Sequence, residues 1–197
     1  MSRLMVRTSA TLRAVLLTLG ANGCVAMGAH ADSLSLDLND DAARLTWRHP
    51  IESNKTQIDA SILHHQNRGN VLAAGFHITG NAATRERPVN AGLGGRFYYT
   101  DADRANADGG ALAVGGFVDA KLPSYNRVGF GGHIYYAPDV LGFGDVEEIL
   151  DITVEANYSV LREGEVYLGW RNVGADFDDR GDVTFDTGFF VGFRLNF

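Results

Sequence analysis

The C-terminal segment, residues 183–197, alternates apolar and polar side chains and ends on a phenylalanine. Successive side chains of a β-strand point to opposite faces, so this alternation predicts a strand with one apolar and one polar face. The predicted apolar face contains Val183, Phe185, Phe189, Val191, Phe193, Leu195 and Phe197, and only Thr187 and Phe190 interrupt the pattern. The segment is longer than the roughly 9 to 11 residues that a tilted strand needs to cross a bilayer. The alternative is the last strand of a soluble sandwich, but soluble strands are usually about 5 to 6 residues long. The segment therefore predicts a membrane-spanning strand whose edge another strand must cover.

The other end of the chain has the features of a secretory signal peptide. Arg3, Arg7 and Arg13 precede a short apolar run over residues 14–19, and Ala29-His30-Ala31 offers a small-x-small cleavage site. The apolar run is too short to span a membrane as a helix. We therefore expect residues 1–31 to be removed and residues 32–197 to form one exported domain. An alternative start is Cys24 as a lipidated N-terminus, because residues 21–24 loosely resemble a lipobox, although Asn22 fits that motif poorly.

Cysteine use and charge narrow the possible functions. Cys24 is the only cysteine, so the exported domain has neither disulfides nor cysteine metal ligands. The formal net charge is −7, and removing the arginines of the signal peptide makes it more negative. Such acidity argues against nucleic acid as a partner.

Ten segments of the exported chain have the pattern of strands. They are residues 33–38, 43–49, 56–65, 70–79, 89–100, 110–122, 126–136, 149–161, 165–174 and 183–197. All four prolines fall between these segments, as a hydrogen-bonded sheet requires. The prediction is an all-β fold, a single closed antiparallel transmembrane β-barrel of about ten strands. Eight strands is the alternative, if the first two segments form an N-terminal hairpin outside the membrane.

The connections between these segments alternate in character. Long, aspartate-rich connections at residues 101–109, 137–148 and 175–182 alternate with tight ones such as Pro123-Ser124 and Glu163-Gly164. Long outer loops and short periplasmic turns are typical of outer-membrane barrels. The expected location is the outer membrane of a Gram-negative bacterium.

The polar faces of the strands predict the contents of the lumen. In the segment 149–161, Leu150, Ile152 and Val154 would face lipid, while Asp151, Thr153 and Glu155 would face inward. The same assignment along the chain also turns Ser61, Asp119, His133 and Glu165 inward, and predicts a polar network of Asp59, Arg96, Arg127, Glu155, Arg171, Asp186 and Arg194. The interior of a barrel of 8 to 10 strands is only just wide enough for side chains, so mixed charges favour a packed polar core over a wide pore. A conducting porin with a narrow pathway is the second hypothesis.

Aromatic and glycine residues add two expectations about the wall. Aromatic residues near strand ends, Tyr98-Tyr99, Tyr135-Tyr136, Phe185 and Phe197, suit the boundary between lipid headgroups and hydrocarbon. Glycines inside strands, such as Gly92, Gly94 and Gly115, allow tight curvature and leave room for inward side chains.

Enzyme and metal chemistry find little support in the sequence. His64 and His65 are adjacent in a strand and point to opposite faces, so the two cannot chelate one ion. Asp59, Ser61 and His65 share a face, which motivates an outer-membrane lipid-modifying enzyme or protease as a third hypothesis. We predict no catalytic residue, no metal site and no cofactor.

The chain resembles the YfaZ family of Gram-negative outer-membrane proteins. The resemblance rests on the start of the exported chain at residues 32–36, on Tyr135-Tyr136-Ala137-Pro138-Asp139, and on the aromatic terminal strand. The C-terminus is also similar to the signal read by the barrel-assembly machinery, with Gly192, Leu195 and Phe197 in matching places and Phe190 where a polar residue is usual. These resemblances imply a small porin-like barrel with a structural or narrow-pore role. They also imply contact with outer-membrane lipid, lipopolysaccharide and that machinery.

Overall fold

One antiparallel sheet contains most of the residues described by a computed structural model, which covers residues 32–51, 55–81, 89–103, 107–178 and 181–197. The residues of the expected signal peptide lie outside these ranges. The strands are β1 (Ser33–Leu38), β2 (Ala42–Ile51), β3 (Thr56–His65), β4 (Gly69–Asn81), β5 (Val89–Ala102), β6 (Ala107–Leu122), β7 (Tyr125–Ala137), β8 (Gly142–Gly144), β9 (Val146–Ser159), β10 (Gly164–Phe177) and β11 (Gly181–Asn196). A 3₁₀ turn, η1 (Asp139–Leu141), precedes β8.

The sheet closes on itself as a barrel. Each long strand pairs with its neighbours in the chain, and β1 pairs with β11 from Ser33↔Asn196 to Leu38↔Val191. The Phe197 N–H extends this closure by donating to the Asp32 carbonyl oxygen at 2.8 Å. The predicted all-β closed antiparallel barrel is thus confirmed, with ten strands in its wall. The eight-strand alternative is wrong, because β1 and β2 are part of the closed ladder.

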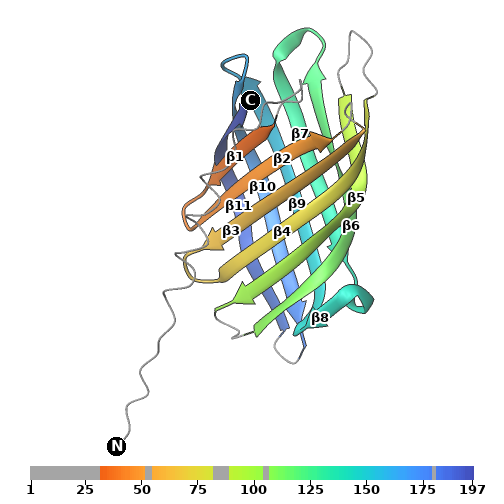
Figure 1. Ribbon diagram of the computed structural model, residues 1–197. Helices are drawn as coiled ribbons and strands as arrows, with labels where there is room; N and C mark the ends of the chain where they lie inside the picture. The colour runs from red at the N-terminus through yellow and green to blue at the C-terminus, as the bar shows by residue number, and fades with distance from the viewer. Residues whose placement is uncertain (1–31, 52–54, 82–88, 104–106, 179–180) are drawn as a thin grey trace, which may run out of the picture.

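The barrel has two different ends, both visible in Figure 1. The terminal end holds Ser33 and Asn196, and the β8 end holds the turn η1 and strand β8. At the β8 end, β8 pairs with residues 109–111 of β6, beyond the part of β6 that pairs with β7. The prediction of long loops at this end is wrong for residues 101–109 and 175–182, because β5, β6, β10 and β11 extend into these segments as strands. In these extensions, small or apolar side chains such as Ala102, Ala107 and Phe177 face inward and are buried. The acidic side chains of the same segments face outward.

The outside of the wall is apolar. Large hydrophobic side chains from β1 to β11 are exposed there, with Leu93 and Phe189 each 75% and Ile78 70% accessible. In β9, Val154 faces outward, whereas Asp151 and Thr153 are buried inside, as predicted. No helix of the described residues is long and apolar enough to cross a membrane. An apolar belt around a closed sheet is the pattern of a barrel that sits in hydrocarbon.

A β-bulge reverses the faces near the start of β11. Val173 pairs with Asp186 and Gly174 pairs with Thr184, so Phe185 has no partner in the ladder. Phe185 and Asp186 are consequently both buried, at 1% and 2% exposure. The prediction that Val183 and Phe185 face lipid is wrong, because an extra residue in a strand shifts the alternation by one position. The faces predicted for Phe189, Val191, Phe193 and Leu195 are correct.

Apolar side chains close the lumen at the β8 end. The set that we call the apolar cap consists of Leu63, Val71, Val146, Ile149, Phe177 and Phe185, none more than 4% exposed. Tyr98 and Tyr135 are also inside and buried, whereas Tyr99 and Tyr136 are on the outer face. The boundary position predicted for Tyr98, Tyr135 and Phe185 is therefore wrong, since adjacent strand residues point to opposite faces.

Candidate functional site

Between the apolar cap and the terminal end, charged side chains from seven of the ten wall strands fill the lumen. We call this set the charge belt: Asp37, Arg44, Asp59, Arg96, Asp151, Glu155, Glu165, Arg171, Asp186 and Arg194. All except Glu155 are less than 9% exposed. Charges removed from water need partners, so the contacts within the belt decide whether it is a stable filling.

Asp151 of β9 is the centre of one group of contacts. Its carboxylate lies 3.5 Å from Arg44 and 3.6 Å from Arg96, and it accepts a hydrogen bond of 2.9 Å from the Tyr98 hydroxyl. His133 Nε2 lies 3.1 Å from the same carboxylate. These partners come from β2, β5 and β7, so a single carboxylate connects strands on different sides of the lumen.

Arg96 extends this group toward β3 and β4. It donates to Asp59 at 2.7 Å, and its guanidinium lies 4.2 Å from the centre of the Tyr135 ring. His77 Nδ1 lies 3.2 Å from the other Asp59 oxygen, and His77 Nε2 is 2.7 Å from the Tyr135 hydroxyl. Stacking of a guanidinium on an aromatic face adds to its ion pairs and fixes its orientation.

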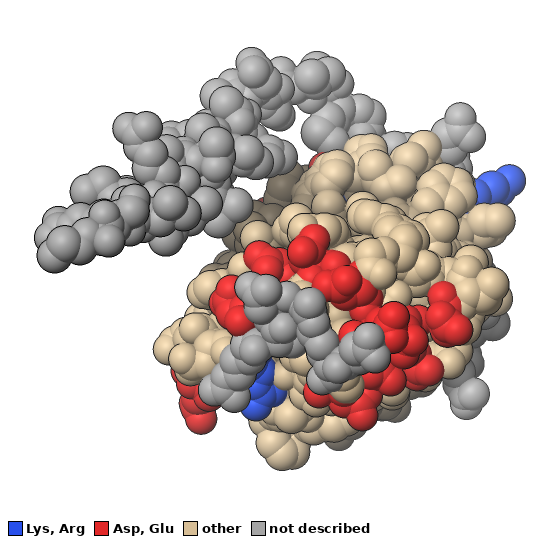
Figure 2. Space-filling view, turned by 90° about the horizontal axis from the view of Figure 1, so that it is seen from below, with Lys and Arg blue, Asp and Glu red and all other residues tan. Residues whose placement is uncertain are grey.

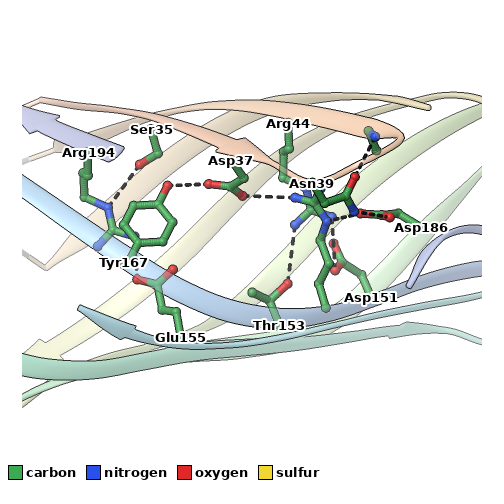
Figure 3. Close-up of polar contacts among 12 residues, drawn as sticks. Ser35, Asp37, Asn39, Arg44, Asp151, Thr153, Glu155, Tyr167, Asp186 and Arg194 are labelled. Atoms are coloured by element: carbon green, nitrogen blue, oxygen red, sulfur yellow. Dashed lines mark hydrogen bonds and ion pairs between the residues drawn. The ribbon is translucent and has the colours of Figure 1, made fainter. Parts of the chain in front are cut away.

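Arg171 of β10 is the most enclosed charge, with a side chain that is 0% exposed. It pairs with Asp186 of β11 and, at 3.2 Å, with Asp37 of β1. Asp37 also accepts a hydrogen bond from the Tyr167 hydroxyl, and Asp186 accepts one of 2.7 Å from Asn39. Figure 3 shows Asp37, Asn39, Tyr167 and Asp186 with their polar groups directed into the lumen.

Arg194 organises the belt nearest the terminal end. It donates to Glu155 at 2.6 Å, to Ser35 at 3.1 Å and to Glu165 at 3.4 Å. Lys121 of β6 reaches Glu165 from the other side at 2.7 Å. The belt contains six acids and four arginines, and Lys121 adds a further positive charge. Its ion pairs run across the barrel, as in a packed core.

The structure places most of the predicted lumen residues in this belt. Asp59, Arg96, Glu155, Arg171, Asp186 and Arg194 all belong to it. Arg127 does not: it is exposed at the terminal end of β7, where the β6–β7 register shifts after Lys121. This shift breaks the simple alternation from which its position was predicted. Sequence reasoning missed Asp37 and Arg44, although Arg44 alternates with outward Leu45 and Trp47 and could have been found by that signal.

Inward glycines make room for the large side chains of the lumen. Gly92, Gly115, Gly169 and Gly192 lie directly opposite Phe117, Tyr135, Phe190 and Tyr167 in the ladders. A Cβ at any of these glycines would collide with the ring of its partner. The expectation that strand glycines leave room for inward side chains agrees with these pairs.

A polar cavity of about 320 Å³ occupies the mouth of the barrel at the terminal end. Its lining consists of Ser33, Arg48, Pro50, Thr56, Gln57, Thr79, Asn90, Asp119, Glu165, Arg194 and Asn196. A second cavity, of about 30 Å³, lies among the belt residues and shares Arg48 and Arg194 with the first. Arg48 and Arg194 thus line both cavities.

The three residues considered for an enzyme all lie on strand β3. Asp59 is bonded to Arg96, and Leu63 lies between Ser61 and His65 on the same face. Residues four apart on a strand are about 13 Å apart, too far for a direct hydrogen bond between Ser61 and His65. His64 points outward to Asn70 at 2.8 Å. Within the described ranges, no group of three or more histidine, cysteine or acidic residues is arranged to hold a metal ion.

Acidic side chains gather at the β8 end, as the view onto that end in Figure 2 shows. Exposed members include Asp101, Asp103, Asp108, Glu148, Asp178 and Asp182. Two of them accept hydrogen bonds from outward tyrosines, Asp108 from Tyr99 and Glu148 from Tyr136. The two ends of the barrel thus differ in charge as well as in closure.

Comparison with known proteins identifies the family. A family model described as "YfaZ precursor" matches residues 11–197. The chain belongs to the YfaZ family. The resemblance seen in the sequence is therefore confirmed. The closed sheet and the apolar outer wall make this chain a barrel protein of the outer-membrane type.

Two solved structures share some likeness with this YfaZ family member. One, described as "Unveiling the Mechanism Behind the in-meso Crystallization of Membrane Proteins", has a TM-score of 0.39 and 12% identity, covering 85% of this chain and 83% of the other. The other is the outer membrane channel DcaP of Acinetobacter baumannii, with a TM-score of 0.38 and 10% identity, covering 83% of this chain and 54% of the channel. No curated protein matches the chain in sequence.

Proposed function

We propose that this protein is an outer-membrane barrel of a Gram-negative bacterium whose lumen is closed, and that its role is structural. The observation that carries this proposal is the burial of Arg171. Its side chain is 0% exposed and forms ion pairs with Asp37 of β1 and Asp186 of β11, next to the apolar cap. A conducting pore keeps water along its axis, whereas the belt binds its charges to one another. The cap adds an apolar layer that would exclude water and ions.

The location is supported by the wall and by the two ends. The outward apolar side chains suit hydrocarbon, and every backbone edge of the wall is paired, as a spanning sheet requires. We assign the terminal end to the periplasm, because the turns there include the tight Pro123-Ser124 connection between β6 and β7. The acidic β8 end would then face outward, toward lipopolysaccharide.

The proposed partners follow from this placement. Acyl chains would contact the outward apolar side chains, and the barrel-assembly machinery would read Gly192, Leu195 and Phe197 during insertion. In the folded barrel, Gly192 lies beneath Tyr167, while Leu195 and Phe197 are outward and 42% and 63% exposed. The two apolar side chains are therefore displayed on the lipid face, where a partner could contact them.

A narrow pore is the second candidate. It is favoured by the two cavities that share Arg48 and Arg194, because one lies at the terminal end and the other among the belt residues. Conduction would then require movement of the apolar cap and exchange of partners within the charge belt. Neither is needed for a structural role.

Planar-bilayer recording of the purified protein separates these candidates. We expect no discrete conductance steps from the wild type under conditions in which an open porin conducts. A variant with Phe177→Ser, Phe185→Ser, Arg44→Ala and Arg171→Ala removes two large side chains from each layer and is expected to conduct. Regular single-channel steps from the wild type would contradict the closed lumen, and recovery of the protein in the soluble periplasmic fraction would contradict the location. Heat-modifiable migration on a gel checks that each variant is folded.

A further inference from the structure

The terminal cavity contains two charges that the charge belt leaves unpaired. Arg48 of β2 lies opposite Asp59 in the ladder, but the Asp59 carboxylate is bonded to Arg96 and near His77. Asp119 of β6 places a carboxylate oxygen over Gly131. Among the described residues, neither Arg48 nor Asp119 makes an ion pair, although both line the same cavity. One positive and one negative group thus face a shared polar space.

The remaining charges of the cavity are already neutralised. Glu165 is bonded to Lys121 and Arg194, and Arg194 is also bonded to Glu155. The rest of the lining is mostly neutral and hydrogen-bonding: Ser33, Thr56, Gln57, Thr79, Asn90 and Asn196. Hydroxyl and amide groups of this kind both donate and accept, so they suit a polar solute without selecting its charge.

We propose that this cavity binds a small zwitterionic solute of the amino acid type, with its carboxylate on Arg48 and its ammonium group on Asp119. A guanidinium binds a carboxylate through two parallel hydrogen bonds, and a carboxylate accepts from an ammonium group. The volume of about 320 Å³ is near the lower end of the roughly 300 to 1,000 Å³ found for small-molecule sites. It suits a free amino acid or a dipeptide better than an oligosaccharide.

This site is independent of the proposed structural role. It depends on the lining of the barrel mouth, and it would bind the same solute in detergent whichever side of a membrane the mouth faced. A bilayer recording without conductance steps therefore does not count against the binding site. In the same way, a failure to bind the solute does not count against the closed lumen.

Isothermal titration calorimetry of the folded protein in detergent tests the assignment. The probes are glycine and L-glutamine as zwitterions, with glucose as a neutral polyol and sodium acetate as an anion alone. We expect saturable binding of the zwitterions that weakens about tenfold or more in Arg48→Gln and in Asp119→Asn, as for the loss of one charge-assisted hydrogen bond. Arg127→Gln removes an arginine at the same end of the barrel but outside the cavity lining and should leave binding unchanged.

Several results would overturn the proposal. These are the absence of saturable binding of either zwitterion, unchanged affinity in Arg48→Gln, or binding of glucose or acetate as tight as that of glycine. If a variant does not fold, an NMR titration of the wild-type protein tests the proposal instead. The Arg48 side-chain Nε signal in an NMR spectrum should shift on addition of glycine, and a signal that does not move also overturns the proposal.

Discussion

The ring of Phe190 lies over Gly169, the residue directly opposite it in the β10–β11 ladder. Phe190 is 2% exposed and also stacks near the Arg171 guanidinium, at 5.0 Å from the ring centre. A Cβ at position 169 would meet both this ring and the Val154 carbonyl oxygen. The glycine is therefore part of the packing of the most buried charge in the lumen.

Gly169→Ala should lower the free energy of unfolding by about 1 to 3 kcal/mol, the usual cost of adding volume to a packed interior. The matched control is Gly174→Ala in the same strand, because the nearest atom to a Cβ there is the Val183 carbonyl oxygen at an ordinary 3.7 Å. Urea titration in detergent, followed by gel mobility without heating, measures both. Equal midpoints for the two variants would show that the ring does not constrain position 169.

Sequence periodicity is sufficient to predict much of this fold. Hydrophobic alternation located all ten wall strands, and it assigned the correct faces to Leu150, Asp151 and Val154. It also brought Arg171 and Asp186 into the lumen. These successes share a cause: between bulges, a strand that separates lipid from a polar interior must alternate strictly.

The errors occur where the alternation is interrupted. A bulge leaves Phe185 without a ladder partner, and a register shift after Lys121 separates Arg127 from the lumen. A bulge adds one residue without any marker of composition, so the sequence alone does not reveal it. The pairing of charges was also beyond sequence reasoning, because Asp151 meets Arg44 from a strand more than 100 residues away.

The bulge predicts opposite chemical accessibility at two adjacent positions. Cys24 is the only cysteine of the chain, so single cysteines introduced into a protein that starts at residue 32 are labelled without background. Thr184→Cys should react rapidly with a water-soluble maleimide, because Thr184 is exposed. Phe185→Cys should react only after unfolding, because Phe185 is 1% exposed within the apolar cap. Mass spectrometry of the folded and unfolded protein follows the reaction. Faster labelling at position 185 than at 184 would rule out the bulge.

Removal of the Arg171 charge should be among the most destabilising single changes in the lumen. Arg171→Met leaves the buried carboxylates of Asp37 and Asp186, 7% and 2% exposed, without their cation. The expected loss is about 3 to 5 kcal/mol, as for the breaking of a buried ion pair from one side. Unfolding in urea measures this loss.

Neutralising the two acids tests the reason for that loss. Arg171→Met combined with Asp37→Asn and Asp186→Asn removes all three charges together, so it should recover part of the lost stability. The matched control is Arg127→Met, which removes an exposed charge. It should change the free energy of unfolding by less than about 0.5 kcal/mol. A triple variant that is weaker than Arg171→Met alone would argue that shape, and not charge, sets the cost.

Phe197 offers a way to separate assembly from stability. Its side chain is 63% exposed, and its backbone N–H closes the barrel by donating to Asp32. Phe197→Ser keeps that N–H and alters nothing in the lumen, so refolding of the purified protein into detergent should be nearly unchanged. If the terminal aromatic is read by the barrel-assembly machinery, the same variant should reach the outer membrane several-fold less in cells. Leu161→Ser is the matched control, since Leu161 is 65% exposed at the same end of the barrel but lies far from the C-terminus in sequence. Quantitative immunoblotting of membrane fractions compares the two, and an equal yield for both variants would mean that Phe197 acts as an ordinary lipid-facing residue.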